Sequence, residues 1–97
     1  MAFIQILDIH TSDFPTLDAL DREWERATEG RHTVRRNIVT RDRNDPNRYM
    51  IIVFFDSYES AMANSALAET AALAEKMGAL IDGPTSFHDL DVIEDRS

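Results

Sequence analysis

The sequence predicts an α+β domain with the element order strand, helix, strand, strand, helix, strand. Three observations predict this order. Two long segments begin with helix-start signals and end at glycine, and four runs are rich in β-branched and aromatic residues. Only the short turn Asp42 to Asn47 separates the second and third runs. The stretches "FIQILDIHTSDF" and "MIIVFFDSYESA" also have the same plan, because each is a strand that leads into a capped helix. The length of 97 residues fits one domain, residues 1–97.

The first strand is predicted at "AFIQILDIH", Ala2 to His10, because apolar and β-branched residues fill most of its positions. Side chains alternate between the two faces of a strand. Apolar residues therefore lie on both faces, with Phe3, Leu7 and Ile9 on one and Ile4 and Ile6 on the other.

The first helix is predicted within "TSDFPTLDALDREWERATEG". Ser12 or Asp13 can cap its start, since a short side-chain oxygen accepts a free N–H of the first turn. Pro15 fits that turn, where no hydrogen-bond donor is lost. Gly30 is a natural end. One apolar stripe follows the helical period: Phe14, Leu17, Leu20, Trp24 and Ala27. The wet face is Asp18, Asp21, Arg22, Glu25 and Arg26.

The second and third strands are predicted at His32 to Arg41 and at Arg48 to Asp56. The intervening "DRNDPN" is rich in turn-forming residues, and so short a connection implies an antiparallel hairpin. In the third strand, both faces are apolar. Tyr49, Ile51, Val53 and Phe55 share one face, and Met50, Ile52 and Phe54 share the other.

The second helical region runs from a cap at Ser57 to about Ile81. Asn64 and Ser65 are weak helix formers in its middle, so we expect a kink or break there. "DGP" ends the region, and the last strand is predicted at Thr85 to Asp95.

This order is the ferredoxin-like split β-α-β arrangement, a four-stranded antiparallel sheet with its helices on one face. The other face of the sheet would then expose apolar residues of the first and third strands. Hiding a few hundred Å² of such surface contributes several kcal/mol, at roughly 25 cal/mol/Å². A second copy of the chain offers an equally apolar face. The sequence therefore predicts a homodimer in which two sheets pack face to face as an α/β barrel.

Composition excludes several classes of function. Asp and Glu total 18 against 10 Lys and Arg, and the net charge of −8 disfavours nucleic acid and anionic membranes as partners. Basic residues do cluster between Arg31 and Arg43, either as a solvated hairpin or as a rim that attracts anions. Absence of Cys excludes disulfides and thiolate catalysis. "MIIVFF" is too short to span a membrane, and the N-terminus lacks the features of a signal peptide. We expect a soluble, cytoplasmic protein.

The chain resembles the dimeric α/β-barrel superfamily and, within it, the antibiotic-biosynthesis-monooxygenase-like domains. "FFDSYESAMANS" carries most of the likeness, with "EG" before the second strand and "DGPTSFHDLDV" near the end. The resemblance implies a family that includes cofactor-independent oxygenases, haem-degrading enzymes and domains without assigned roles. In the oxygenases an electron-rich phenolate activates oxygen itself inside a dry apolar pocket. No cofactor is expected here.

The resemblance also implies where a site would lie. Asn64 occupies the position of a polar, often histidine, pocket residue of the second helix and is expected to hold a substrate oxygen. Ala68 stands where an aromatic residue would support oxygenase activity. The candidate pocket walls are Trp24, Tyr49, Phe54 and Phe87. The resemblance implies Asn on the first strand and Trp and His on the second helix for haem degradation; this chain has none of them there, so a haem-degrading site is not expected.

Other functional residues remain ambiguous in the sequence. His10, His32 and His88 belong to separate strands, and "HDLD" alternates between faces, so no three-ligand metal site is expected. Asn64 can act as a kink residue instead of a ligand contact. We therefore expect a monooxygenase that acts on a small aromatic or apolar molecule. The alternatives are a non-catalytic domain of the same fold and an accessory subunit that docks through its acidic surface.

Overall fold

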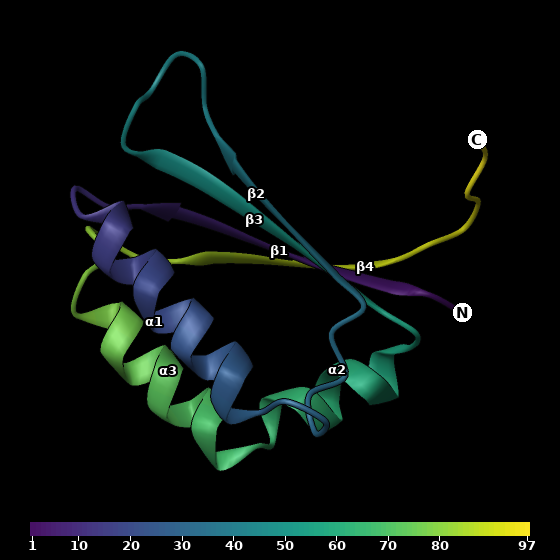
Figure 1. The fold of residues 1–97 in the computed structure, drawn as a ribbon. Helices are drawn as coiled ribbons and strands as arrows, with labels where there is room; N and C mark the ends of the chain where they lie inside the picture. Colours follow the sequence, from purple (N-terminus) through teal and green to yellow (C-terminus); the bar gives the residue numbers. More distant parts are fainter.

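The computed structural model describes residues 1–97 as one antiparallel sheet covered by helices on one side (Figure 1). The sheet has the strand order β2-β3-β1-β4. The elements are β1 (Phe3–His10), α1 (Phe14–Ala27), β2 (Arg36–Arg41), β3 (Arg48–Phe55), α2 (Tyr58–Ser65), α3 (Ala68–Gly78) and β4 (Ser86–Asp91). The predicted element order and sheet are confirmed, with the second helical region divided into α2 and α3.

The register places the two most apolar strands at the centre of the sheet. Ile6 of β1 lies opposite Ile52 of β3, and Ile38 of β2 lies on the far side of Ile52. On the other side of β1, Ile6 lies opposite His88 of β4. The central strands thus have neighbours on both edges, which pair their backbone N–H and C=O groups.

Capping residues set where the helices begin. Asp13, not Ser12, caps α1, because its Oδ1 accepts the N–H of Thr16 at 3.3 Å. Gly30, with φ of +79°, makes the left-handed turn that leads the chain away from α1. Ser57 caps α2 by accepting the N–H of Ser60 at 3.0 Å.

The predicted interruption near Asn64 and Ser65 is confirmed. α2 ends at Ser65, and Leu67 has extended backbone angles before α3 begins at Ala68. The change of direction lets α3 pack along α1 while α2 remains under the end of β3 (Figure 1). Asn64 is therefore in the last turn of a short helix.

Three elements are shorter than predicted. β2 begins at Arg36 and not at His32, because Thr33 is held by α2 instead of the sheet: its N–H donates to Asn64 and its hydroxyl to the carbonyl of Ser60. α3 ends at Gly78 and not near Ile81. The chain then turns back to the sheet, where the N–H of Asp82 donates to the carbonyl of His10. β4 ends at Asp91 and not at Asp95.

The core lies between the helices and the sheet and is small. Only 10 of 97 residues are buried, so the single chain leaves much of its apolar surface open. One cluster joins Ile9, Leu17, Ile51 and Met77, and a second joins Phe3, Phe55 and Ala61. All the strand residues in these clusters come from one face of the sheet, which is the face that meets the helices.

The opposite face of the sheet, which we call the open face, carries no helix (Figure 1). Leu90 is exposed on this face, and its other apolar residues are half-buried: Ile4, Ile6, Ile38, Met50, Ile52 and Phe54. None of the helices combines the length and apolar character required to cross a membrane.

Candidate functional site

A cavity of about 330 Å³ lies between the helix layer and the sheet. Every element except β4 contributes to its lining, including the segment before β2. The lining residues are Gln5, Leu7, Asp21, Trp24, Glu25, His32, Val34, Arg35, Arg36, Asn37, Ile51, Val53, Phe55, Asn64, Thr70, Leu73 and Met77. This volume and this mixture of apolar walls with a few polar groups are typical of small-molecule sites.

The apolar part of the cavity comes from the central strands and from α3. Leu7, Ile51 and Val53 project from β1 and β3, and Leu73 and Met77 project from α3. Alternation along β1 and β3 directs these side chains to the helix face. An apolar molecule placed here would leave water and contact hydrocarbon on two sides.

Asn64 is the polar residue at the α2 end of the cavity. It is only 8% exposed, and its Oδ1 accepts the backbone N–H of Thr33 at 3.2 Å. A backbone N–H can only donate, so this bond fixes which end of the amide is oxygen. The Nδ2 amine makes no hydrogen bond within the protein. Asn64 therefore presents a fixed donor that can hold a ligand oxygen.

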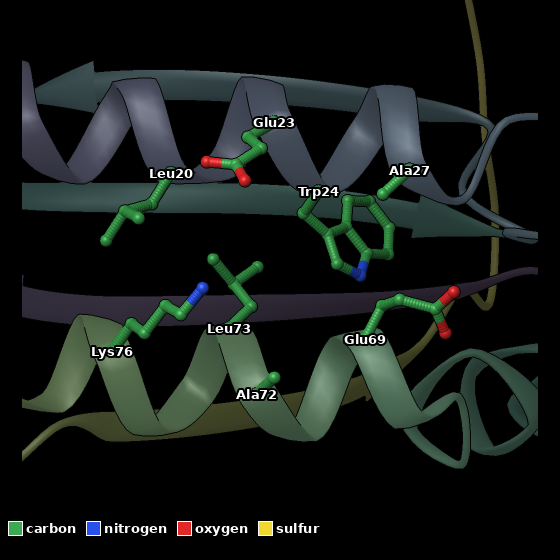
Figure 2. A pocket seen from close by; sticks show the side chains of 8 residues that line it. All are labelled: Leu20, Glu23, Trp24, Ala27, Glu69, Ala72, Leu73 and Lys76. Atoms are coloured by element: carbon green, nitrogen blue, oxygen red, sulfur yellow. The ribbon is translucent and has the colours of Figure 1, made fainter.

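Trp24 forms part of the outer wall of the cavity. Its Nε1–H donates to Thr70 Oγ1 at 3.0 Å, which ties α1 to α3. On its other side it lies near His32, with ring centroids 5.5 Å apart. Figure 2 shows Trp24 and Leu73 between the two helices, where they also line a separate outer groove of about 150 Å³. These two side chains thus separate that groove from the cavity.

Acidic groups line the α1 side of the cavity. Asp21 is half-buried there, and burial raises the pKa of its carboxyl, with the nearby Glu25 and Asp18 adding to the effect. Asn37 Nδ2 donates to Asp21 Oδ2 at 3.4 Å, which only partly offsets the lost hydration. Asp21 was predicted to lie on the wet face of the first helix, and the structure places it at the cavity.

Basic groups at the mouth of the cavity are only partly neutralised. Arg35 donates to Asp56 Oδ2 through Nε at 2.9 Å and through Nη2 at 2.6 Å. This pairing raises the pKa of Arg35 and lowers that of Asp56. Arg36 has no acidic partner and lies over the ring of Phe54, 5.7 Å from its centroid. Arg36 thus has no carboxylate partner, and its guanidinium lies over an aromatic ring of the open face.

The structure brings together two of the five residues predicted for the site. Asn64 and Trp24 line the cavity. Tyr49 stacks on Phe14 with centroids 4.4 Å apart, so its ring closes the far end of the core. Phe54 lies on the open face, as its alternation with Val53 and Phe55 requires. Phe87 is 60% exposed on the edge strand β4.

The sequence analysis predicted only Asn64 and Trp24 among the cavity residues, and Asp21 and His32 are two of those that it missed. Asp21 precedes Trp24 by three positions, so both lie on one side of α1. This spacing is the signal in the sequence that could have placed Asp21 beside Trp24. His32 was predicted to belong to a strand, but it lies in the segment between α1 and β2, where its buried Nδ1 has no hydrogen-bond partner. No group of three or more His, Asp or Glu side chains is placed to hold a metal ion.

No protein-family model and no curated protein matches this chain. Solved structures do share its fold. An antibiotic biosynthesis monooxygenase candidate from Caulobacter crescentus CB15 matches at a TM-score of 0.82 and 11% identity, over 96% of this chain and 91% of that chain. Rv0793 from Mycobacterium tuberculosis matches at 0.80 and 12% identity over 100% of both chains. A further candidate from Chloroflexus aurantiacus J-10-fl matches at 0.76 and 19% identity, over 100% and 98%. The resemblance to antibiotic-biosynthesis-monooxygenase-like domains is therefore confirmed for the fold.

Proposed function

We propose that this protein binds a small aromatic or apolar molecule in the cavity and oxidises it without a cofactor. The observation that carries the proposal is the free Nδ2 donor of Asn64, which is fixed by Thr33 in a cavity of about 330 Å³. The names of structures with the same fold support the reaction class, since several are described as monooxygenase candidates.

The chemistry follows from what the cavity offers. An electron-rich phenolate or enolate can itself reduce oxygen, so the protein need only bind it, orient it and keep water away. The Asn64 amine would donate a hydrogen bond to the anionic oxygen, and such bonds strengthen as negative charge develops. Leu7, Ile51 and Leu73 would contact the ring system.

Oxygen consumption with a panel of anthrone-like phenols is the direct test. We expect uptake above the rate in buffer, together with a raised melting temperature when the same compounds are bound. If no compound is turned over and none shifts the melting temperature, the proposed function is wrong.

Binding without turnover is a second candidate function. α2 and α3 give the cavity Asn64, Thr70, Leu73 and Met77, with no aromatic side chain among them, and Ala68 does not line it. This composition favours a binding protein if an aromatic group on that side is needed for oxidation. A thermal shift with no oxygen uptake would identify this function.

A homodimer formed through the open face is also part of the proposal. The apolar side chains of β1 and β3 on this face have no cover from the chain's own helices. A twofold partner would bury Phe54 and Ile52 against their own counterparts. The predicted closed barrel would result.

A further inference from the structure

We propose that Asp21 is a catalytic base, which removes a proton from the ligand at the end of the cavity remote from Asn64. The inference rests on the proposed function, because it concerns how the cavity would convert a bound aromatic molecule to its anion. The residue pair that carries it is Asn64, whose amide N–H donors make no hydrogen bond within the protein, and Asp21, a carboxyl with acceptor capacity that the protein leaves unused.

The segment from Thr33 to Asn37 contacts both Asn64 and Asp21. Thr33 contacts Asn64, and Asn37 contacts Asp21. Four residues of extended chain span at most about 14 Å, which bounds the backbone between the two contacts, and both residues line the same cavity. Trp24 lies one helical turn beyond Asp21 and forms part of the same cavity wall. A flat aromatic ligand in this cavity would have both a donor and a carboxylate among the groups around it.

The surroundings of Asp21 suit a base. Its only hydrogen bond is the long one from Asn37, and it reaches Oδ2, so Oδ1 is left without a protein partner. Arg22 is the nearest cation on its helix, but its Nε donates to Asp18 at 2.9 Å. Glu25 shares the cavity and repels the negative form, while His32, Arg35 and Arg36 line other parts of the wall. A carboxylate with so little hydration or pairing is a better proton acceptor than one in water.

The proton transfer balances without an oxidant. In anthrone, a C–H bond of the central methylene breaks, and the proton passes to the Asp21 carboxylate, which becomes a neutral acid. The electron pair moves through the ring to the carbonyl oxygen opposite, which becomes an enolate. The Asn64 amine donates to that oxygen. Return of a proton from Asp21, after exchange with solvent, regenerates the ligand.

Hydrogen–deuterium exchange at the anthrone methylene tests this step directly. The protein is mixed with anthrone in D₂O under argon, and loss of the methylene proton signal is followed by NMR. We expect the wild-type protein to accelerate exchange over buffer, and Asp21→Asn to lose at least about a hundredfold of the acceleration. Glu23→Gln is the matched control, since Glu23 lies on the same helix and does not line the cavity, and it should retain the rate within about twofold.

The pH profile adds a readout that a structural role would not change. Exchange should rise with pH as Asp21 ionises and then level off, and Asp21→Asn should abolish that rise. Equal exchange by Asp21→Asn and wild type, or wild-type exchange at the buffer rate, would overturn the inference. Oxygen uptake is measured separately in air. If the protein exchanges the proton but consumes no oxygen, the proposed oxygenase function is wrong and the role of Asp21 as a base still holds.

Discussion

Asn64 shows how one side chain can serve both the fold and a site. Its oxygen accepts the N–H of Thr33, a residue outside the sheet, and its amide NH₂ makes no hydrogen bond within the protein, in a residue that lines the cavity. Sequence reasoning left a kink role and a ligand role as alternatives. The hydrogen bond makes them compatible, because each uses a different end of the amide.

Two substitutions at Asn64 separate these roles. Asn64→Ala leaves the Thr33 N–H without a partner and should cost about 1–3 kcal/mol in the free energy of unfolding. Asn64→Asp keeps an acceptor for that N–H but removes the donor, so it should fold and lose affinity for a phenolate or enolate. Chemical denaturation and thermal shift with anthrone measure the two effects. If Asn64→Asp binds as tightly as wild type, the amine has no part in binding.

Asp8 gives a pH dependence with a definite sign. Arg48 donates to its two oxygens at 3.0 and 2.6 Å, and these bonds lower the pKa of Asp8 below its ordinary 3.8. The stabilisation is therefore complete above about pH 4 and is lost as the pH falls through the lower folded-state pKa. Asp8→Asn should reduce the free energy of unfolding by about 1–2 kcal/mol at pH 7 and by progressively less in acid.

Urea denaturation between pH 2 and pH 7 measures that difference. Asp95→Asn provides the control, because Asp95 lies after β4 and makes no hydrogen bond through its side chain. A wild-type-to-Asp8→Asn difference that stays constant down to pH 2 would show that the pair does not stabilise the fold through ionisation.

At the scale of the elements, α2 is the helix on which the candidate site depends. It has only eight residues, and such a short helix is marginal without its cap. The Ser57 hydroxyl oxygen accepts the N–H of Ser60 and also lies 3.2 Å from the Ser60 hydroxyl. Loss of this cap should loosen the helix that positions Asn64.

Ser57→Ala should therefore destabilise the protein by about 1 kcal/mol and speed amide exchange in the first turn of α2. The matched control is Ser12→Ala, because Ser12 precedes α1 while Asp13 provides the cap there. We expect Ser12→Ala to leave stability within about 0.5 kcal/mol of wild type. An equal loss in both variants would mean that the Ser57 contact contributes nothing specific.

At the scale of the whole molecule, the homodimer proposed above would form through the open face. Ile52 lies at its centre, between Ile6 and Ile38. Sedimentation at micromolar concentration should give a particle of twice the 11.1 kDa chain mass. Ile52→Asp should reduce it to the chain mass, because a buried unpaired carboxylate is costly. Ala71 is exposed on α3 and provides the control, so Ala71→Glu should remain dimeric.

A wild-type particle of only 11.1 kDa would refute the homodimer and the closed barrel. The cavity would survive that result, since all the residues that line it belong to one chain.

The sequence by itself determined the element order, the two faces of β1 and β3, and the break after Asn64. These are local properties: side-chain alternation, capping and weak helix formers act within a few residues of each other. It also placed Asn64 and Trp24 in a group that proved to share a cavity.

Tertiary structure alone decided which other residues join them. Asp21 belongs to the cavity because α1 crosses beside β2, and His32 because Thr33 bonds to α2 and keeps the chain out of the sheet. Phe54 and Phe87 are outside it because strand alternation and the edge position of β4 set where they point. Such placements depend on contacts between residues far apart in the chain, and periodicity within one segment carries no information about them.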